Sequence, residues 1–321
     1  MNVLVTGANG FVGYKLVTLL SNNAKYIVRA CTRSRDVQLP SSGHITIPDL
    51  DGQTDWSMAL ASIDVVVHTA ARVHVMHEAA IDPLAEFRRT NMDGTINLAT
   101  QAAAAGVRRF IFISSIKVNG EETSPGKAFY ADDIPAPQDP YAISKYEAEQ
   151  ALLALARRSS MEVVIIRPVL VYGPGVKANF LSMMQWIHKG IPLPLGSLTR
   201  NRRSMVALEN LLDLISVCLH HPAAANQIFL VSDGEDLSTT ELLTRTAQAI
   251  GVKTRLLPMP VALLMLITRL LGKSNVAQRL CGSLQVDISK TRDLLDWQPP
   301  LAVDAALQET AAMFLDTKVK H

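Results

Sequence analysis

The sequence of 321 residues lacks any paired-cysteine pattern. Its three cysteines, Cys31, Cys218 and Cys281, lie far apart, and none of them forms a CxxC pair. This spacing excludes a disulfide framework and a cysteine-ligated structural zinc site, and it indicates a reducing, cytoplasmic compartment. The first ten residues, MNVLVTGANG, contain no basic segment followed by an apolar one, so we expect no secretory signal.

A charge excess of either sign is also missing. The 31 Lys and Arg residues against 29 Asp and Glu residues give a formal net charge of +2. Such a balance gives no electrostatic reason to expect nucleic acid or an anionic membrane as the main partner. Hydrophobic residues make up 48% and charged residues 19%, which favours a folded chain with a large core.

No apolar run reaches the ~18 residues that a membrane-spanning helix needs. The run that most resembles such a helix, VALLMLITRLL at residues 261–271, is shorter and contains Arg269. We therefore expect a buried helix of a second subdomain here, and no integral membrane segment. Association of this run with a membrane surface is the alternative.

Short β-branched runs alternate with helix-like segments through the first half of the chain. The runs lie at residues 3–6, 26–31, 44–47, 65–68, 110–113 and 162–166, and the helix-like segments include 13–20 and 82–106. Alternation of this kind predicts βαβ units with right-handed crossovers. The fold class is therefore α/β, a Rossmann-type doubly wound parallel sheet.

Glycine and proline interrupt the pattern after Arg167, so the following part is expected to be rich in loops. A further strand at residues 228–231 is expected to return to the main sheet, and the C-terminal part is mostly helical. We expect a dinucleotide-binding domain at residues 1–175. A smaller, discontinuous substrate-binding region follows at 176–321, with a segment near 207–235 returning to the first domain.

A glycine-punctuated turn follows the first strand. Gly7, Gly10 and Gly13 form GANGFVG between that strand and a helix. Glycine permits a tight turn and close backbone approach to a pyrophosphate, and the helix N-terminus offers free N–H groups. The context of strand, turn and helix predicts a dinucleotide site.

The end of the second strand bears on the choice of cofactor. An acidic residue there binds a ribose 2′-hydroxyl, whereas arginine suits a 2′-phosphate. The sequence has Thr32, Arg33 and Arg35 at this place and no acid, which favours NADP(H) and leaves NAD(H) as the alternative. The Asp49–Leu50 turn after the third strand either contacts adenine or is an ordinary polar turn.

Tyr141 and Lys145, in YAISK, are spaced to share one face of a helix. A phenol has an unperturbed pKa of about 10, and a neighbouring ammonium is expected to lower it. Such a pair is suited to moving a proton beside a carbonyl or alcohol. Ser115 ends the strand in FIFISS, at the edge where an α/β sheet places its site, and can orient the reacting oxygen.

Six motifs occur in one order along the chain: TGANGFVG at 6–13, HTAA at 68–71, NMDGT at 91–95, SSIKVNG at 114–120, YAISK at 141–145 and RPVLVYGPG at 167–175. With DISKTRDLLDWQP at 287–299, this set resembles the extended short-chain dehydrogenase/reductase superfamily, in its nucleotide-sugar epimerase/dehydratase branch. The resemblance covers nearly the whole chain. It also extends, through RVHVM and the RNRRS segment, to the bacterial group that forms UDP-N-acetylquinovosamine for surface polysaccharide.

The resemblance implies roles for single residues. Tyr141 would be the acid/base, Lys145 would bind the nicotinamide ribose and tune Tyr141, and Ser115 would hold the substrate oxygen. Asn179 and Arg203 would contact the nucleotide diphosphate of a UDP-sugar. The implied cofactor contacts are Gly7, Asn9, Gly10, Phe11, Val12, Gly13, Thr32, Arg33, Asp49, Leu50, Ala70, Lys145 and Pro168.

Two departures from the pattern are visible. Ile116 and Lys117 stand where the 4,6-dehydratases have an Asp-Glu pair, which argues against dehydration. Asn119 replaces the tyrosine of the usual VYG, and the sequence offers no account of that change. His74 and His77 could suggest a metal, but no third ligand is evident, so we expect no metal site and instead a loop role near the substrate.

Three functions remain open. The first is a reductase that acts on the C4 keto group of a UDP-4-keto-6-deoxy-N-acetylhexosamine with NADPH. The second is a 4-epimerase of a UDP-hexose or UDP-N-acetylhexosamine that retains NAD. The third is a non-catalytic NADP-binding regulator, against which the intact Ser115, Tyr141 and Lys145 argue. The branch commonly forms homodimers, although no sequence feature demonstrates one here.

Overall fold

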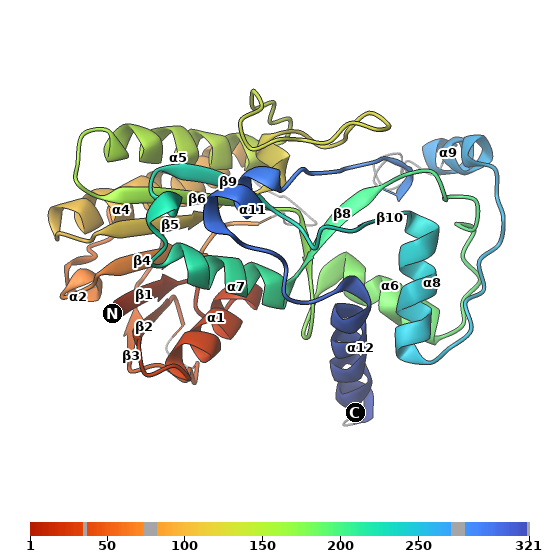
Figure 1. Ribbon diagram of the computed structural model, residues 1–321, viewed down its shortest axis with the longest axis horizontal. Helices are drawn as coiled ribbons and strands as arrows, with labels where there is room; N and C mark the ends of the chain where they lie inside the picture. Colours follow the sequence, from red (N-terminus) through yellow and green to blue (C-terminus); the bar gives the residue numbers. More distant parts are fainter. Residues whose placement is uncertain (35–36, 74–81, 271–279, 320–321) are drawn as a thin grey trace.

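A computed structural model describes residues 1–34, 37–73, 82–270 and 280–319, which form two lobes side by side (Figure 1). The larger lobe is built on a seven-stranded sheet in the order β3-β2-β1-β4-β5-β6-β9, in which all neighbours are parallel. Its strands are β1 (Asn2–Thr6), β2 (Ile27–Thr32), β3 (Gly43–Thr46), β4 (Val65–His68), β5 (Arg109–Ile113), β6 (Glu162–Pro168) and β9 (Gln227–Val231).

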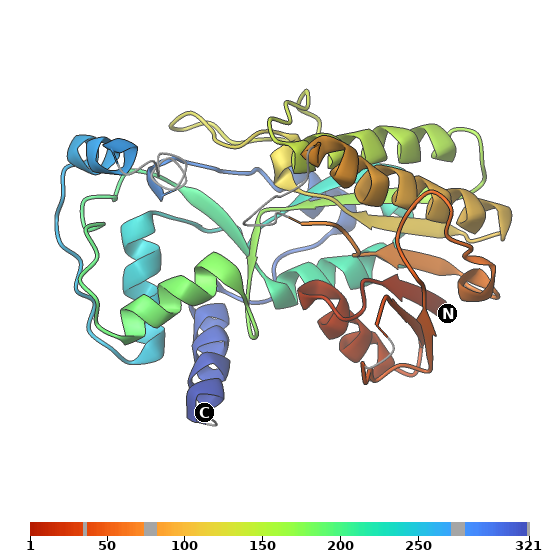
Figure 2. The same cartoon turned by 180° about the vertical axis from the view of Figure 1, so that it is seen from behind.

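Helices cover both faces of this sheet, as Figures 1 and 2 show. One face packs against α1 (Phe11–Ser21) and α7 (Leu208–Cys218), and the other against α2 (Ser57–Leu60), α4 (Gly94–Ala104) and α5 (Pro140–Ala156). Alternate residues of β1 serve the two cores: Val3 and Val5 face α1, and Leu4 faces the opposite layer. The expected doubly wound Rossmann-type sheet is confirmed.

The helix expected over residues 82–106 consists of three consecutive segments. These are α3 (Pro83–Arg88), the π-helical η1 (Arg89–Asp93) and α4. The carboxylate of Asp82 accepts the Ala85 N–H and so caps α3. The π-turn places Asn91 in the interior, where its side chain is 1% exposed, and such turns are frequent at functional sites.

The smaller lobe contains a three-stranded sheet in the order β10-β8-β7. Its core is shared with helices of the C-terminal half.

The remaining elements of the two lobes are η2 (Ile116–Val118), β7 (Leu170–Tyr172), α6 (Ala178–His188), β8 (Arg203–Ala207), η3 (Pro222–Ala224), β10 (Asp236–Leu237), α8 (Thr239–Ile250), α9 (Val261–Leu270), α11 (Ser289–Leu295) and α12 (Val303–Val319).

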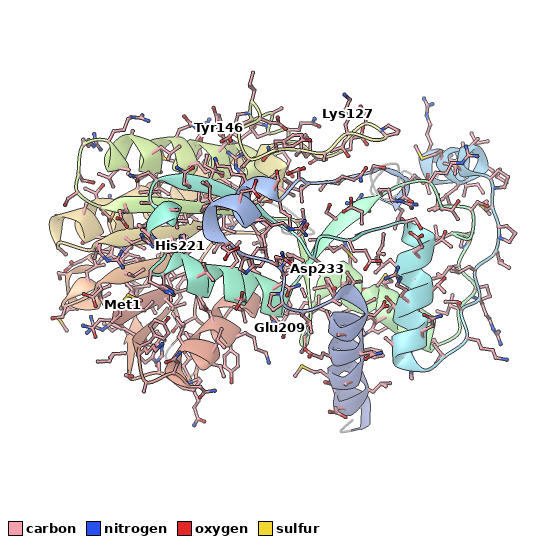
Figure 3. All side chains as sticks on the ribbon, viewed as in Figure 1. Met1, Lys127, Tyr146, Glu209, His221 and Asp233 are labelled. Atoms are coloured by element: carbon pink, nitrogen blue, oxygen red, sulfur yellow. The ribbon has the colours of Figure 1, made fainter. Side chains whose placement is uncertain are left out.

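Asp233 joins the two lobes at the point where Figure 3 labels it. It follows β9 of the large sheet, and its carboxylate accepts the Ala207 N–H at the end of β8, at 2.7 Å. The same carboxylate accepts the Tyr172 hydroxyl at 2.8 Å and the Asn210 amide at 2.7 Å. One acidic side chain therefore fixes β7, β8 and α7 relative to the last strand of the large sheet.

The apolar run near residue 261 forms α9, but the expectation that this helix is buried is wrong. Leu264 is its one buried residue, while Leu266 is 54% and Leu270 78% exposed. The helix projects at the end of the small lobe far from the large sheet in both views (Figures 1 and 2). Among the described residues, no helix is long and apolar enough to cross a membrane.

Candidate functional site

The glycine turn after β1 leaves no room for side chains. A Cβ on Gly13 would lie 2.2 Å from the Gly7 carbonyl oxygen, and one on Gly7 would lie 2.7 Å from the Ala70 amide nitrogen. Gly7 also has a φ of +66°, in the left-handed region that favours glycine. The sequence folds tightly here because glycine alone permits this approach of the turn to α1 and to the end of β4.

The N-terminus of α1 opens at this turn. Its N-cap is Gly10, which supplies no side-chain hydrogen bond, and its first turn contains no acidic residue. Phe11 and Val12 begin the helix, and Asn9 and Gly10 are exposed. Uncapped N–H groups and the positive end of the helix suit an anionic phosphate group. The cradle therefore fits the pyrophosphate of a dinucleotide.

A chain of buried hydrogen bonds runs behind the turn. Thr6 Oγ1 lies 2.7 Å from Nδ1 of His68, and Nε2 of His68 lies 3.0 Å from Thr95 Oγ1. Thr95 donates to the Asn91 carbonyl oxygen at 2.7 Å, and the Asn91 amide donates to Ser144 Oγ at 3.0 Å. Burial, reinforced by the charge of Lys145, lowers the pKa of His68 to about 3, so this imidazole is neutral at neutral pH.

Ser115, Tyr141 and Lys145 come together where β5 ends and α5 begins. Tyr141 and Lys145 lie on α5, which starts because the Asp139 carboxylate accepts the Ala142 N–H at 2.7 Å and Pro140 occupies the first turn. A side-chain hydrogen bond links Ser115 to the Tyr141 phenol. The Lys145 ammonium is buried, donates to the Ile113 carbonyl oxygen at 2.9 Å and lies 4.3 Å from the centroid of the Phe112 ring.

The expectation that Lys145 lowers the pKa of Tyr141 is not met by this arrangement. Burial and the negative charge of Asp139 raise the pKa of Tyr141 to about 12, and the hydrogen bond from Ser115 opposes that rise. Burial also lowers the pKa of Lys145 to about 7, against the opposing effect of Glu149. At neutral pH the phenol therefore carries its proton.

Lys117 is part of an ion-pair cluster at the start of α5. Its ammonium pairs with the Asp139 carboxylate and lies 3.2 Å from Glu121 Oε1. The pair lowers the pKa of Asp139, whose negative charge in turn raises the pKa of Tyr141. Lys117 therefore offsets part of the negative charge beside the phenol.

A buried ion pair lies next to the Tyr141–Lys145 helix face. Arg167 donates to both oxygens of Glu149, at 3.0 Å and 2.6 Å, and the two side chains are at most 1% exposed. Ser114 donates to Glu149 at 2.5 Å, and the third Arg167 nitrogen donates to Asn119 Oδ1 at 2.9 Å. The Asn119 amide donates to the Tyr130 carbonyl oxygen at 2.9 Å.

This network gives Asn119 a role that sequence reasoning did not find. Its carbonyl oxygen satisfies a buried guanidinium, and its amide ties the loop at Tyr130 to β6. Glu149 and Arg167 were also missed. The signal available for them was one charged residue within the buried face of a helix and one at the end of an apolar strand, since such charges are almost never buried unless paired.

The residues expected to hold the adenosine end lie around Asp49. Its carboxylate accepts the Leu50 N–H at 2.8 Å and an Arg89 N–H at 2.6 Å, while Arg33 lies 3.8 Å away with its side chain 68% exposed. Thr32 donates to the Ser34 carbonyl oxygen at 2.6 Å. Two guanidinium groups therefore meet one carboxylate beyond the ends of β2 and β3.

The remaining expected residues are spread over both lobes. Pro168 ends β6 beside Val231 of β9, Asn179 is exposed in the first turn of α6, and Arg203 begins β8 and donates to the Gly282 carbonyl oxygen at 3.2 Å. Their assignment as contact residues stays a prediction. Arg35, His74 and His77 lie outside the described residues.

Comparison with known proteins gives one family. The sequence profile of the NAD dependent epimerase/dehydratase family matches residues 3–232. A UDP-glucose 4-epimerase of Vibrio cholerae is 50% identical over 314 residues, covering 98% of this chain and 95% of that protein. An N-acetyl-alpha-D-glucosaminyl-diphospho-ditrans,octacis-undecaprenol 4-epimerase of Escherichia coli O157:H7 is 27% identical, covering 90% of this chain and 88% of that protein.

Solved structures agree on the fold. The UDP-glucose 4-epimerase of Thermotoga maritima with UDP-glucose superposes with a TM-score of 0.78 at 22% identity, covering 99% of this chain and 100% of that one.

Proposed function

Because the chain belongs to the NAD dependent epimerase/dehydratase family, we propose that it is an oxidoreductase acting at C4 of a UDP-linked hexose. The convergence of Ser115, Tyr141 and Lys145 at the carboxyl edge of the sheet carries this proposal. A bound nicotinamide would supply the hydride for C4 in a reduction, or would accept and return it in an epimerisation.

Within this site Tyr141 would hold the proton that the C4 oxygen gains or loses. Its pKa of about 12 keeps the phenol protonated, which is the state that a proton donor to a forming alkoxide needs. Ser115, hydrogen-bonded to the same phenol, would fix the C4 oxygen beside it. Lys145 would donate a hydrogen bond from its ammonium to the ribose of the cofactor.

The cofactor would lie across the glycine turn. The turn and α1 would hold the pyrophosphate through Gly7, Asn9, Gly10, Phe11, Val12 and Gly13, with Ala70 and Pro168 farther along. Thr32, Arg33, Asp49 and Leu50 would surround the adenosine end. The residues 176–321, apart from the part near 207–235, would form the sugar-nucleotide region, in which Asn179 and Arg203 contact the diphosphate.

Two reactions share these residues. Reduction of a UDP-4-keto-6-deoxy-N-acetylhexosamine, which yields UDP-N-acetylquinovosamine for surface polysaccharide, is favoured by the absence of an acid at the end of β2. The exposed Arg33 there suits a 2′-phosphate and hence an exchangeable NADPH. The second reaction, 4-epimerisation, is favoured by the 50% identity to the Vibrio cholerae UDP-glucose 4-epimerase.

One experiment separates the two reactions. Purified protein is mixed with UDP-4-keto-6-deoxy-N-acetylglucosamine and NADPH, and the loss of the reduced-nicotinamide absorbance is followed together with the sugar product. Stoichiometric oxidation with a 6-deoxy UDP-sugar product would establish the reductase. The absence of oxidation, with 4-epimers forming from UDP-glucose or UDP-N-acetylglucosamine without added cofactor, would establish the epimerase. No turnover in either assay would contradict the proposal.

A further inference from the structure

Helix α9 and the segment before it expose apolar side chains that a folded core would bury. The side chains at least 39% exposed are Leu257, Val261, Leu263, Met265, Leu266 and Leu270. The face turned to the lobe consists of Leu264, with Ile267 and Thr268 partly covered. An exposed apolar surface of this kind marks an interaction site.

The charged residues in the stretch of sequence that contains this surface have one sign. From residue 242 to residue 286 the sequence has six Lys and Arg residues and no Asp or Glu. Among those that the structure describes, Lys253, Arg255 and Arg269 are exposed, and none of the three forms an ion pair with a described residue. A basic, apolar surface complements an anionic, apolar partner.

The surface is held firmly to the small lobe. The Leu193 N–H donates to the Arg255 carbonyl oxygen at 2.9 Å, and the Gly196 N–H donates to the Leu257 carbonyl oxygen at 3.0 Å. Leu264 belongs to the core of that lobe. With ten residues, α9 is about 15 Å long, half the thickness of a bilayer's hydrocarbon core. Such a helix can lie in a membrane interface and cannot cross it.

We propose that residues 253–270 form a docking surface for an anionic phospholipid membrane. The exposed leucines would enter the boundary of the acyl chains, and Lys253, Arg255 and Arg269 would contact the phosphate-bearing headgroups. A second copy of the chain fits the surface less well. A two-fold contact sets the same patch against itself and would bring the cations of both copies together without a described acidic residue between them.

The test is co-sedimentation of the full-length protein with vesicles. Vesicles of phosphatidylcholine alone are compared with vesicles that contain an equal part of phosphatidylglycerol, at low and high salt. Binding is expected for the anionic vesicles and is expected to weaken as salt rises. The double variant L266Q/L270Q should lower the partition coefficient at least about tenfold, because two leucine side chains no longer enter the interface.

Two controls test whether the loss of vesicle binding is specific to α9. Met58→Gln alters a side chain that is 78% exposed on the large lobe and should bind vesicles as the wild type does. Far-UV circular dichroism and NADPH binding should be the same in all variants. The proposal is overturned if the wild type does not bind anionic vesicles, or if L266Q/L270Q binds them equally well. Self-association that L266Q/L270Q abolishes, without vesicle binding by the wild type, overturns it in favour of a second copy.

Discussion

Thr6 and His68 are joined by a buried hydrogen bond in which the imidazole is the acceptor. Thr95 uses its one hydroxyl proton on the Asn91 carbonyl oxygen, so Thr95 Oγ1 must accept from Nε2–H of His68. Nδ1 is then unprotonated and accepts the Thr6 hydroxyl at 2.7 Å. The neutral Nε2–H form of His68 thus links the strand before the glycine turn to the π-turn beside α5.

Acid should destabilise the protein through His68. The unfolded chain binds a proton at this residue below pH 6.5, and the folded chain does so only near pH 3. Between these values the unfolded state binds more protons, so the free energy of unfolding falls as the pH falls, by up to about 1.4 kcal/mol per pH unit. Urea unfolding at a series of pH values measures the slope.

The variant His68→Asn should flatten that slope, although it lowers the stability at neutral pH. His220→Asn, at an exposed histidine, should keep the wild-type slope. An unchanged slope in His68→Asn would show that His68 does not cause the pH dependence of the free energy of unfolding.

Tyr141→Phe should lower the rate of turnover by about 10²- to 10⁴-fold, the range expected for loss of a general acid or base. The phenyl ring can keep its edge contact with Phe87, whose centroid lies 6.1 Å away, so the fold and the affinity for the cofactor should not change. Turnover assays and a fluorescence titration with NADPH measure the two effects. Retention of full activity would exclude Tyr141 as the proton donor.

Arg167→Met should lower the free energy of unfolding by about 3–5 kcal/mol, because it leaves the Glu149 carboxylate buried without its partner. The double variant Arg167→Met, Glu149→Leu should lose less than the sum of the two single variants, as the two charges are removed together. Urea unfolding gives all three values.

A matched control for that pair is the exposed ion pair of Arg88 and Glu147, whose side chains are 46% and 29% exposed. Arg88→Met should cost no more than about 1 kcal/mol. Equal losses from Arg88→Met and Arg167→Met would show that burial does not set the strength of the inner pair.

Arg33→Ala should weaken NADPH binding by about ten- to a hundredfold and leave NADH binding nearly unchanged, since only NADPH carries the 2′-phosphate that a guanidinium binds. The dissociation constants of both cofactors are measured by titration. Arg157→Ala, at an exposed arginine that ends α5, is the control and should affect neither. Tighter binding of NADH than of NADPH by the wild type would contradict the preference for NADP(H).

The large sheet could be predicted from sequence because its signals are local. The run at 110–113 is apolar throughout and the run at 65–68 is apolar except for His68, as expected of strands buried on both faces. The glycine turn lies between a strand and a helix, which is the context that predicts a dinucleotide site. The placement of Tyr141 and Lys145 on one face of a helix likewise follows from their spacing of four residues. These features needed no knowledge of what the rest of the chain does.

Other features could not be predicted because they depend on contacts between distant residues. Asn119 acquires its partner Arg167 only when η2 and β6 lie side by side. Lys145 was expected to lower the pKa of the Tyr141 phenol, but its ammonium donates to the Ile113 carbonyl oxygen, and burial together with the charge of Asp139 raises that pKa. For α9 the composition is the same whether its leucines face a core or a surface, so sequence could not decide between them.

The position of β9 in the chain has a consequence for folding during synthesis on the ribosome. The strand pairs with β6 from Val164 to Pro168, yet it is synthesised only after β7, α6, β8 and α7. At about 5–20 residues per second, the growing chain carries β6 with one unpaired edge for several seconds. An unpaired strand edge is a template for association with another chain. We therefore expect association with other chains through this sheet edge to be a hazard of synthesis that the finished fold, in which β9 pairs with β6, removes.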